Sequence, residues 1–418
     1  MSTEKNTSNS QLVYRNYTIY VYKKSYIFLS AYFIVKSLME IKEYIERFAE
    51  EVFDEKNIKI LHYLPENPRN FAKISRLAKL PYETTRSRLI KLIRDERVLR
   101  ITANVDYYRL GLSIYTIIAS AQPYLVSEAK DLLKTKYTLS IVRCYGECNG
   151  YLADFCFPIG REEILLNYLS KLRESEVFTR MLIFKRTPFK INRVNFLEYY
   201  DLTSHKWKVS YLDWAEEVLS ANISSEKVPF EGPRIAFFDS TDLIILRELE
   251  VDGTKDFVDL AKIVGITPQG IRYHYYRHIV GKNLIDGYDI SIYPYPPLLT
   301  TSLAGIISFN GFDNMCRFIN ATYGKPFLHA YAKIFGENKL LVYMRIPSVN
   351  VSRFYEALDY LCSKKVIQGY FLAQIDEKSF QKYIELYRNY SEGEWLIDEN
   401  EFLSKIERAR GLTGIRIL

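Results

Sequence analysis

Cysteine is scarce in this sequence, and the sparse set argues against a disulfide framework. The 418 residues contain five cysteines, an odd number, and no two of them form a Cys-x-x-Cys pair. Small secreted domains that depend on disulfides carry a denser set, and a structural zinc site needs roughly four closely spaced ligands. We therefore expect a reducing, cytoplasmic location, with no bound metal and no cofactor.

The sequence also lacks an apolar run long enough to cross a membrane. Its most apolar N-terminal stretch, residues 17–35, is interrupted by Lys23 and Lys24, whereas a spanning helix needs about 20 consecutive apolar residues. No small-residue cleavage site of the signal-peptide kind follows it. Two interpretations remain open, an N-terminal arm over residues 1–38 or a chain whose translation starts at Met39. Neither predicts a membrane partner.

Familiar catalytic motifs and a strong charge excess are absent too. The chain has no Ser-His-Asp order, no Walker loop and no His-Glu-x-x-His motif, and it contains only five histidines. Lys and Arg total 57 against 50 Asp and Glu, so the net charge is +7. Such a small excess does not identify a nucleic-acid partner, and the position of the basic residues matters more. We expect no catalytic residues and no enzyme activity.

What the sequence does contain is an internal repeat, which is the most informative feature of the chain. Residues 57–100 align with residues 242–286, with one inserted residue early in the second copy. The matched apolar positions include Leu61 with Leu246, Leu64 with Leu249, Phe71 with Phe257, Ile74 with Leu260, Leu89 with Tyr275 and Ile93 with Ile279.

The segment after each copy repeats the same order of predicted elements, β-α-β-β-α-β, which is typical of a ferredoxin-like fold. Pro158 and Pro347 close the third strand at the same place in both copies. We therefore predict an α+β protein in which two winged helix-turn-helix domains alternate with two ferredoxin-like domains of the ligand-sensing type. The predicted boundaries are an N-terminal extension at 1–38, a winged helix-turn-helix at 39–105, a ferredoxin-like domain at 106–187, a linker with a helix at 188–238, a second winged helix-turn-helix at 239–292, a second ferredoxin-like domain at 293–376 and a helical tail at 377–418.

Each repeat predicts three short helices with a sharp turn before the third, the arrangement in which the third helix enters the major groove of DNA. Asp256 and Thr267 are predicted N-caps of the second and third helices of the later copy. The extended segments that follow, 98–105 and 284–292, are predicted to form wings.

The third helices carry the basic residues. The later copy has no acidic residue between Thr267 and Lys282. The basic face of such a helix is usually just exposed to solvent. Because a basic helix stands third in both copies, we expect these two helices to contact DNA. His274 and His278 are four residues apart and could chelate a metal, but we expect His278 to meet the core edge or a phosphate. The predicted DNA-binding residues are Gln269, Arg272, Tyr273, His274, Arg277 and Lys282 in the later copy and Tyr82, Thr84, Arg86, Arg88 and Lys91 in the earlier one.

The later repeat resembles the N-terminal domain of the leucine-responsive and asparagine (Lrp/AsnC) family of transcription regulators. The residues that carry this resemblance are Asp242, Leu246, Asp252, Gly253, Leu260, Ala261, Gly265, Ile266, Leu284, Ile285, Gly287 and Tyr288. It implies a transcription regulator that binds double-stranded DNA and responds to a small-molecule effector. It also implies two-fold assembly, as a homodimer or as a pseudo-dimer within one chain. The ligand-binding residues that it suggests are Gly146, Glu147, Gly336 and Glu337.

Two alternatives stay open. The same pair of folds resembles the siroheme decarboxylases, tetrapyrrole enzymes that would need a catalytic or axial histidine and an arginine-lined cavity. Of the five histidines, His329 is the one whose predicted strand could turn it into a pocket, although we expect instead a strand histidine satisfied by its neighbours. The other alternative is a ligand-binding or architectural protein without sequence-specific DNA reading, which Glu83, Asp95 and Glu96 on the earlier third helix would suit.

Overall fold

Residues Glu55–Leu418 form one compact unit of the computed structural model. The predicted arm at 1–38 lies outside the described residues. Within the described part of the chain, no helix has both the length and the apolar character needed to cross a membrane. The structure describes residues 43, 50–95, 98–232, 234–292 and 299–414.

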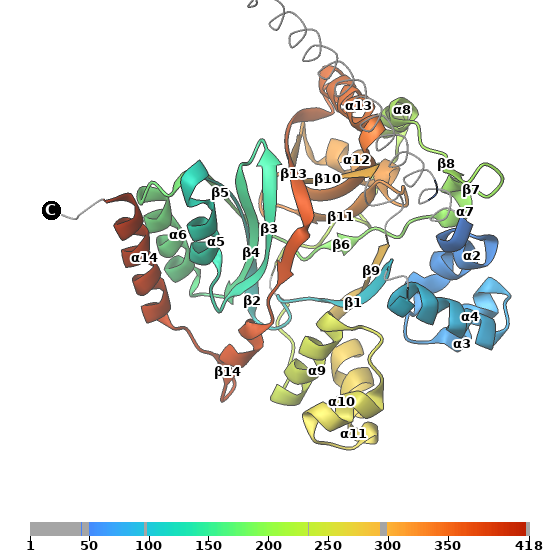
Figure 1. Ribbon diagram of the computed structural model, residues 1–418, viewed down its shortest axis with the longest axis horizontal. Helices are drawn as coiled ribbons and strands as arrows, with labels where there is room; N and C mark the ends of the chain where they lie inside the picture. Colours follow the sequence, from blue (N-terminus) through green and yellow to red (C-terminus); the bar gives the residue numbers. More distant parts are fainter. Residues whose placement is uncertain (1–42, 44–49, 96–97, 233, 293–298, 415–418) are drawn as a thin grey trace, which may run out of the picture. The chain divides into compact units, whose positions relative to one another are not determined.

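A nine-stranded antiparallel sheet with the order β5-β2-β4-β3-β13-β10-β12-β11-β6 is the largest element (Figure 1). Each half of the sheet places its four long strands in the order fourth, first, third, second along the chain. The α+β class predicted from the sequence is therefore confirmed. The strands are β2 (Leu112–Ala121), β3 (Thr138–Gly146), β4 (Gly150–Pro158), β5 (Phe178–Arg186), β6 (Lys190–Ile191), β10 (Thr300–Phe309), β11 (Leu328–Lys333), β12 (Lys339–Pro347) and β13 (Ile367–Lys382).

The strands are apolar on both faces because both faces are covered. On one face, helix α6 packs against the strands of the first half. Its buried residues include Leu165, Leu169 and Leu172. On the other face, a cluster including Ile118, Cys144, Ile306 and Leu341 draws residues from both halves. Such double coverage explains why these strands read as continuous apolar runs. The helices that belong to the two halves of the sheet are α5 (Val126–Leu133) and α6 (Glu162–Glu174) in the first half and α12 (Phe312–Thr322) and α13 (Val351–Ser363) in the second.

The two halves join edge to edge through β3 and β13. Ala373 pairs with Gly146, and the pairing resumes beyond an irregularity at Gln381 and Ile141. Strand β13 is 16 residues long, so it hydrogen-bonds β10 in its own half and β3 in the other half. The sheet therefore contains strands from both copies of the repeat within a single chain.

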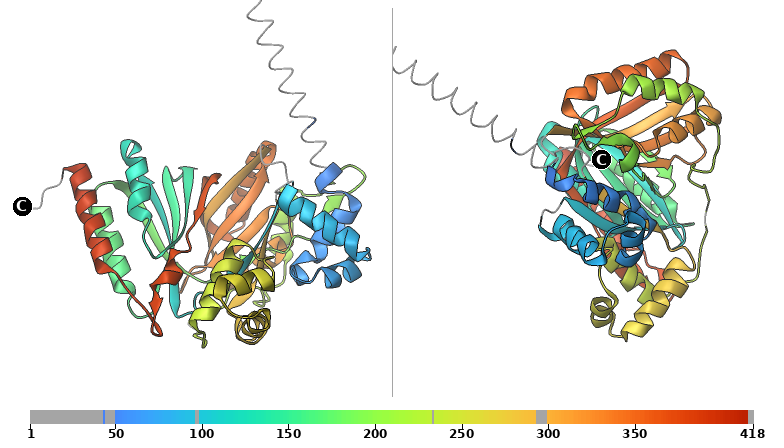
Figure 2. Two further views of the ribbon diagram at one scale, coloured as in Figure 1. Left: turned by 60° about the horizontal axis from the view of Figure 1, so that its bottom comes forward. Right: turned by 90° about the vertical axis from the view of Figure 1, so that its right-hand side faces the viewer.

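Each half also sends its trailing segment across to the other half. After β5 the chain adds β6 beside β11, and helix α8 (Tyr211–Ser220) packs on α12 and α13. After β13 the chain returns through a short hairpin to α14 (Glu399–Thr413), which packs on α6 (Figures 1 and 2). The tail predicted as helical therefore begins as strand, since residues 377–382 belong to β13. The hairpin strands are β14 (Tyr390–Ser391) and β15 (Glu394–Trp395).

Two three-helix groups correspond to the two repeats. The predicted N-caps Asp256 and Thr267 are confirmed, because each side chain accepts a backbone N–H three residues later. Both third helices continue into π-helical turns, η2 (Lys91–Asp95) and η4 (His274–Val280). The helices are α2 (Glu55–Tyr63), α3 (Phe71–Ala78), α4 (Tyr82–Ile90), α9 (Ser240–Val251), α10 (Phe257–Val264) and α11 (Pro268–Tyr273).

The predicted wings pair with each other. Strands β1 (Leu99–Val105) and β9 (Ile285–Ile292) form an antiparallel two-stranded ribbon with Ile101 opposite Ile290. The sequence places these strands about 180 residues apart, and strand periodicity identifies a buried face without identifying the partner. The ribbon therefore links the two repeats.

Candidate functional site

A cavity of about 590 Å³ lies between the β1–β9 ribbon and the nine-stranded sheet, and we name it the ribbon cavity. Residues of both halves line it, from strands β1 to β6, β9 and β11 to β13 and from helix α9. Its volume falls within the roughly 300–1,000 Å³ typical of small-molecule sites. The apolar wall includes Val105, Leu139, Val142, Phe189, Met344 and Ile375.

A buried ion pair from the first half forms part of this wall. Arg186 Nη2 lies 3.1 Å from Asp154 Oδ1, and the two side chains are only 3% and 6% exposed. Arg186 Nε donates to Thr116 Oγ1 at 2.7 Å, and Ser140 Oγ donates to Asp154 Oδ2 at 3.1 Å. The guanidinium also stacks over the Phe189 ring at 3.9 Å. Because its hydrogen-bonding groups are engaged, this pair tolerates burial that an isolated charge would not.

A second ion pair ties the ribbon to the sheet. Arg345 on β12 donates twice to Glu377 on β13, from Nε at 2.9 Å and from Nη2 at 3.1 Å. Its Nη1 donates to the carbonyl of Ile292 at 3.1 Å, at the end of β9. The planar guanidinium thus binds a carboxylate with two parallel bonds and still reaches the ribbon.

Glu250 brings the second helix group and the tail to the cavity. Lys382 Nζ lies 2.9 Å from Glu250 Oε1, and the hydroxyls of Tyr107 and Tyr387 each donate to this carboxylate at 2.6 Å. Burial raises the pKa of both tyrosines, so their hydroxyls stay protonated and keep donating. Glu250 lies in the last turn of α9, and the network therefore connects that helix with β13.

His329 on β11 lines the ribbon cavity, whereas the sequence favoured a strand histidine satisfied by its neighbours. Burial, with the positive charge of Arg345, lowers the pKa of His329 below its usual value, so the imidazole is neutral at neutral pH. Its Nε2 lies 3.8 Å from Asp289 Oδ2 on β9. Asp289 Oδ1 is buried without a hydrogen-bond partner among the described residues. A neutral imidazole can ligate a metal ion or exchange a proton.

The charges of the ribbon cavity balance. Its four acidic side chains, Asp154, Glu250, Asp289 and Glu377, match the cations Arg100, Arg186, Arg345 and Lys382. Of the described cations of the wall, Arg100 is the one without a salt bridge to a described residue, and it is exposed on β1 beside the Phe380 ring at 5.9 Å. Arg100 is therefore the cation most open to an anionic ligand.

The cavity is one asymmetric site despite the repeat. Strand register makes Leu139 the counterpart of His329, and Asp154 the counterpart of Tyr343. All four residues line the same cavity. The imidazole and the buried carboxylate therefore each occur in one copy alone, so the two halves supply different chemical groups.

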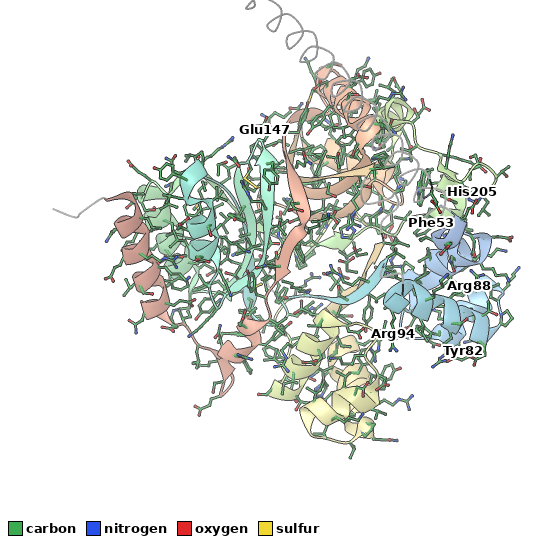
Figure 3. The ribbon with its side chains drawn as sticks, in the orientation of Figure 1. Phe53, Tyr82, Arg88, Arg94, Glu147 and His205 are labelled. Carbon is green, nitrogen blue, oxygen red and sulfur yellow. A yellow bond between two sulfur atoms is a disulfide. The ribbon has the colours of Figure 1, made fainter. Side chains whose placement is uncertain are left out.

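The predicted DNA-binding residues divide by exposure. Tyr82 and Tyr273 are 45% and 57% exposed, and Figure 3 shows Tyr82 together with Arg88 on α4. Arg88 is half-buried and donates to Asn57 Oδ1 at 3.1 Å. The other exposed members are Arg86, Lys91, Gln269, Arg272 and Arg277, while Thr84 is half-buried and Lys282, also half-buried, contacts the Phe237 ring.

His274 and His278, predicted to contact DNA or the core edge, bond to Asp242. DNA contact by the other residues stays a prediction.

The four predicted ligand-binding residues lie in turns between strands, and none of them lines the ribbon cavity. Gly146 is the last residue of β3, and Glu147 follows it in the β3–β4 turn, where Figure 3 labels Glu147. Gly336 donates its N–H to Glu231 Oε1 at 3.2 Å, and Glu337 forms an ion pair with Lys339. A ligand at these turns remains a prediction.

The cysteine interpretation needs correction at one place. Cys144 and Cys148 are joined by a disulfide across the β3–β4 turn, with Cα atoms 5.7 Å apart. The four-residue spacing did not suggest a pair, but the hairpin brings both side chains into the same buried cluster. Cys156 and Cys316 are buried free thiols.

Sequence reasoning singled out none of the charged residues of the cavity. Asp154, Arg186 and Arg345 each stand in a strand whose other residues are largely apolar. A charge inside such a strand is rarely buried unless it is paired. A charged residue inside an otherwise apolar predicted strand was therefore the feature of the sequence that could have indicated these three residues.

Comparisons with known proteins agree with this fold. No family model and no curated protein matches the chain. The crystal structure of the siroheme decarboxylase NirDL matches with a TM-score of 0.50 and 12% identity, covering 85% of this chain and 100% of that one. The same enzyme in complex with an iron-uroporphyrin III analogue matches with a TM-score of 0.50 and 9% identity, covering 84% of this chain and 99% of that one.

No family model supports the resemblance of the sequence to Lrp/AsnC regulators. The Lrp-type structure PH0061 covers 32% of this chain at 15% identity with a TM-score of 0.27, too low to support an argument. The expectation that the chain has no enzyme activity is corrected, because the two solved structures that match it with a TM-score of 0.50 are those of a decarboxylase.

Proposed function

We propose that the chain is an enzyme that binds a carboxylate-bearing tetrapyrrole in the ribbon cavity and removes carboxyl groups from its side chains. The observation that carries this proposal is His329, a neutral imidazole in a cavity of about 590 Å³ beside Arg345. The fold shared with a siroheme decarboxylase supports it.

The wall suits an anionic macrocycle in three respects. Apolar side chains such as Val142 and Met344 offer a surface for the ring, and Arg100 offers a charge for a carboxylate. The unpartnered oxygen of Asp289 offers an acceptor beside His329. Because the cavity is balanced in charge, additional ligand carboxylates would have to compete with Glu377 for Arg345.

Loss of carbon dioxide from a carboxymethyl side chain breaks its C–C bond and leaves the electron pair on the methylene carbon. That carbon then needs one proton to become a methyl group. His329 can supply it, because a histidine with a lowered pKa is a strong acid once it has taken a proton from solvent. Any iron in the ring belongs to the substrate.

The test is to titrate the purified full chain with iron-uroporphyrin III while recording its absorbance and the mass of the product. We expect a shifted absorbance band and loss of carbon dioxide, both diminished in His329→Ala. His205→Asn is the matched control, since His205 is an exposed loop residue with φ of 51° that asparagine tolerates. An unchanged spectrum and turnover in His329→Ala would contradict the proposal.

A second candidate function is DNA binding by the third helices, which requires the two helix groups to act as winged helix-turn-helix domains beside ferredoxin-like halves. The exposed Arg272 and Arg277 favour it. Replacing both by alanine should weaken specific binding by about 1–3 kcal/mol for each base-contacting arginine. A mobility-shift assay measures this effect, with the exposed pair Arg173→Ala and Arg353→Ala as the charge-matched control. Equal affinity of the two double variants would exclude this candidate.

A further inference from the structure

Four metal-ligating side chains converge at the start of the second helix group. They are Asp239, Asp242, His274 and His278, and one ligand atom from each lies within 4.8 Å of the other three. None of them lines the ribbon cavity, so the cluster is separate from the site proposed above.

Local structure explains why they meet. Asp239 is the N-cap of α9, and Asp242 completes a capping box with it, which fixes both carboxylates at one helix end. His274 and His278 belong to η4 and are four residues apart, so they project from the same side of that π turn. The cluster thus joins the start of the first helix to the end of the third.

The distances approach those of a coordination shell. Nδ1 of His274 lies 2.8 Å from Asp242 Oδ1, Nδ1 of His278 lies 2.9 Å from Asp242 Oδ2, and both Nδ1 atoms lie 3.8 Å from Asp239 Oδ2. Zinc bonds to nitrogen and oxygen of about 2.0–2.2 Å place tetrahedral ligands about 3.3–3.5 Å apart. The widest separation among the four ligand atoms, at most 4.8 Å, would close to this range if each atom of that pair moved by about 0.7 Å.

The burial of Asp242 requires compensation. Its side chain is fully buried, and its salt-bridge partners among the described residues are the two imidazoles, with no lysine or arginine among them. Burying a carboxylate is costly unless hydrogen bonds or a positive charge compensate it, and a bound cation would supply that charge. The side chain of Asp239 is 40% exposed and leaves a path for an ion to enter.

The earlier repeat supplies an internal comparison. In the alignment of the two copies, Asp242 corresponds to Asn57, His274 to Arg88 and His278 to Leu92. Arg88 Nη1 donates to Asn57 Oδ1 at 3.1 Å, so the same two positions are bridged there by a hydrogen bond. At these matched positions, the first helix is therefore linked to the third by a neutral acceptor and an arginine in the earlier copy, and by a carboxylate and imidazoles in the later copy.

We propose that Asp239, Asp242, His274 and His278 bind one divalent transition-metal ion, with Zn²⁺ as the best fit, and that the ion fastens η4 to the start of α9. Two imidazoles and two carboxylates suit a borderline cation such as Zn²⁺, whereas Mg²⁺ prefers an all-oxygen shell. The ion would set the position of η4, which carries Arg277, relative to α9.

The test uses the full chain after dialysis against a chelator, with ZnCl₂ added during calorimetric titration and thermal unfolding. We expect stoichiometric zinc binding and a higher midpoint of unfolding, with no comparable effect of MgCl₂. The decisive variant carries the residues of the earlier copy, Asp242→Asn with His274→Arg, because that pairing already fits this fold. Circular dichroism checks that the variant is folded.

The variant should lose more than the roughly 10–100-fold in metal affinity that removing a supporting hydrogen-bond partner costs. His278→Leu, the other exchange with the earlier copy, should behave likewise, and His205→Asn should bind zinc as the parent does. Failure of the parent chain to bind zinc, or undiminished binding by the folded double variant, would overturn the proposal. Neither result bears on tetrapyrrole binding, because the two sites share no residue.

Discussion

The protonation state of His329 in the ribbon cavity is set by the residues around it. His329 lies among Arg345, Asp289, Glu377 and Arg100, and the first cause of its lowered pKa is burial. The opposing influence of the two carboxylates does not cancel that effect. The imidazole is therefore kept neutral by the fold, which is the form that ligates a metal ion.

This lowered pKa predicts a pH dependence of stability. The usual pKa is 6.5, so the unfolded chain takes up the proton at a higher pH than the folded chain does. The contribution of His329 to stability is complete above that value and declines as the pH falls below it. We expect urea unfolding between about pH 8 and about pH 5 to show a smaller loss of stability for His329→Gln than for the parent chain.

His205→Asn serves as the control and should retain the full pH dependence, because His205 is exposed. Identical pH profiles for His329→Gln and the parent chain would show that His329 does not carry this effect.

At the scale of elements, the sheet depends on close approach between backbones. A Cβ added to Gly305 on β10 would lie 1.9 Å from the carbonyl oxygen of Phe371 on β13. Gly369, on that same neighbouring strand, has nothing within 4 Å of such an atom. The two glycines therefore differ in the space available, although both lie in the sheet.

Gly305→Ala should destabilise the chain by about 1–3 kcal/mol or more, because β10 and β13 must separate to admit the methyl group. Gly369→Ala should change stability by less than about 0.5 kcal/mol. Denaturant unfolding of both variants measures the difference. Equal stabilities would mean that β10 and β13 do not pair in the described register.

Across the whole molecule, the two halves are held together by exchange of their trailing segments. Helix α14 follows the second half but buries Phe402 against Tyr137, Phe157 and Tyr168 of the first half. Helix α8 follows the first half and buries Trp214 against Phe318 and other rings of the second. Neither helical layer is complete without a segment from the other copy.

Phe402→Ala should therefore cost about 3–5 kcal/mol of unfolding free energy, as expected for a large buried ring. Leu403 is the matched control, because it is the next residue on the same helix and is 53% exposed. Leu403→Ala should stay within about 0.5 kcal/mol of the parent chain. A neutral Phe402→Ala in thermal or denaturant unfolding would argue against the docking of α14 on the first half.

The sequence alone determined the local features of this protein. Apolar periodicity and the repeat gave the order of helices and strands in both copies, and side-chain chemistry gave the caps at Asp256 and Thr267. His329 could be singled out because it is one of few histidines and stands in a strand. These features depend on residues that are close together in the chain.

Only the tertiary structure decided which buried faces meet. Strand β1 pairs with β9, Arg186 with Asp154, and Arg345 with Glu377, and the trailing helices exchange halves. Periodicity states that a face is buried but carries no information about its partner. Partners distant in the chain are selected by complementary shape and charge in three dimensions, so the ribbon cavity and the Asp239–His278 cluster emerge only when the chain is folded.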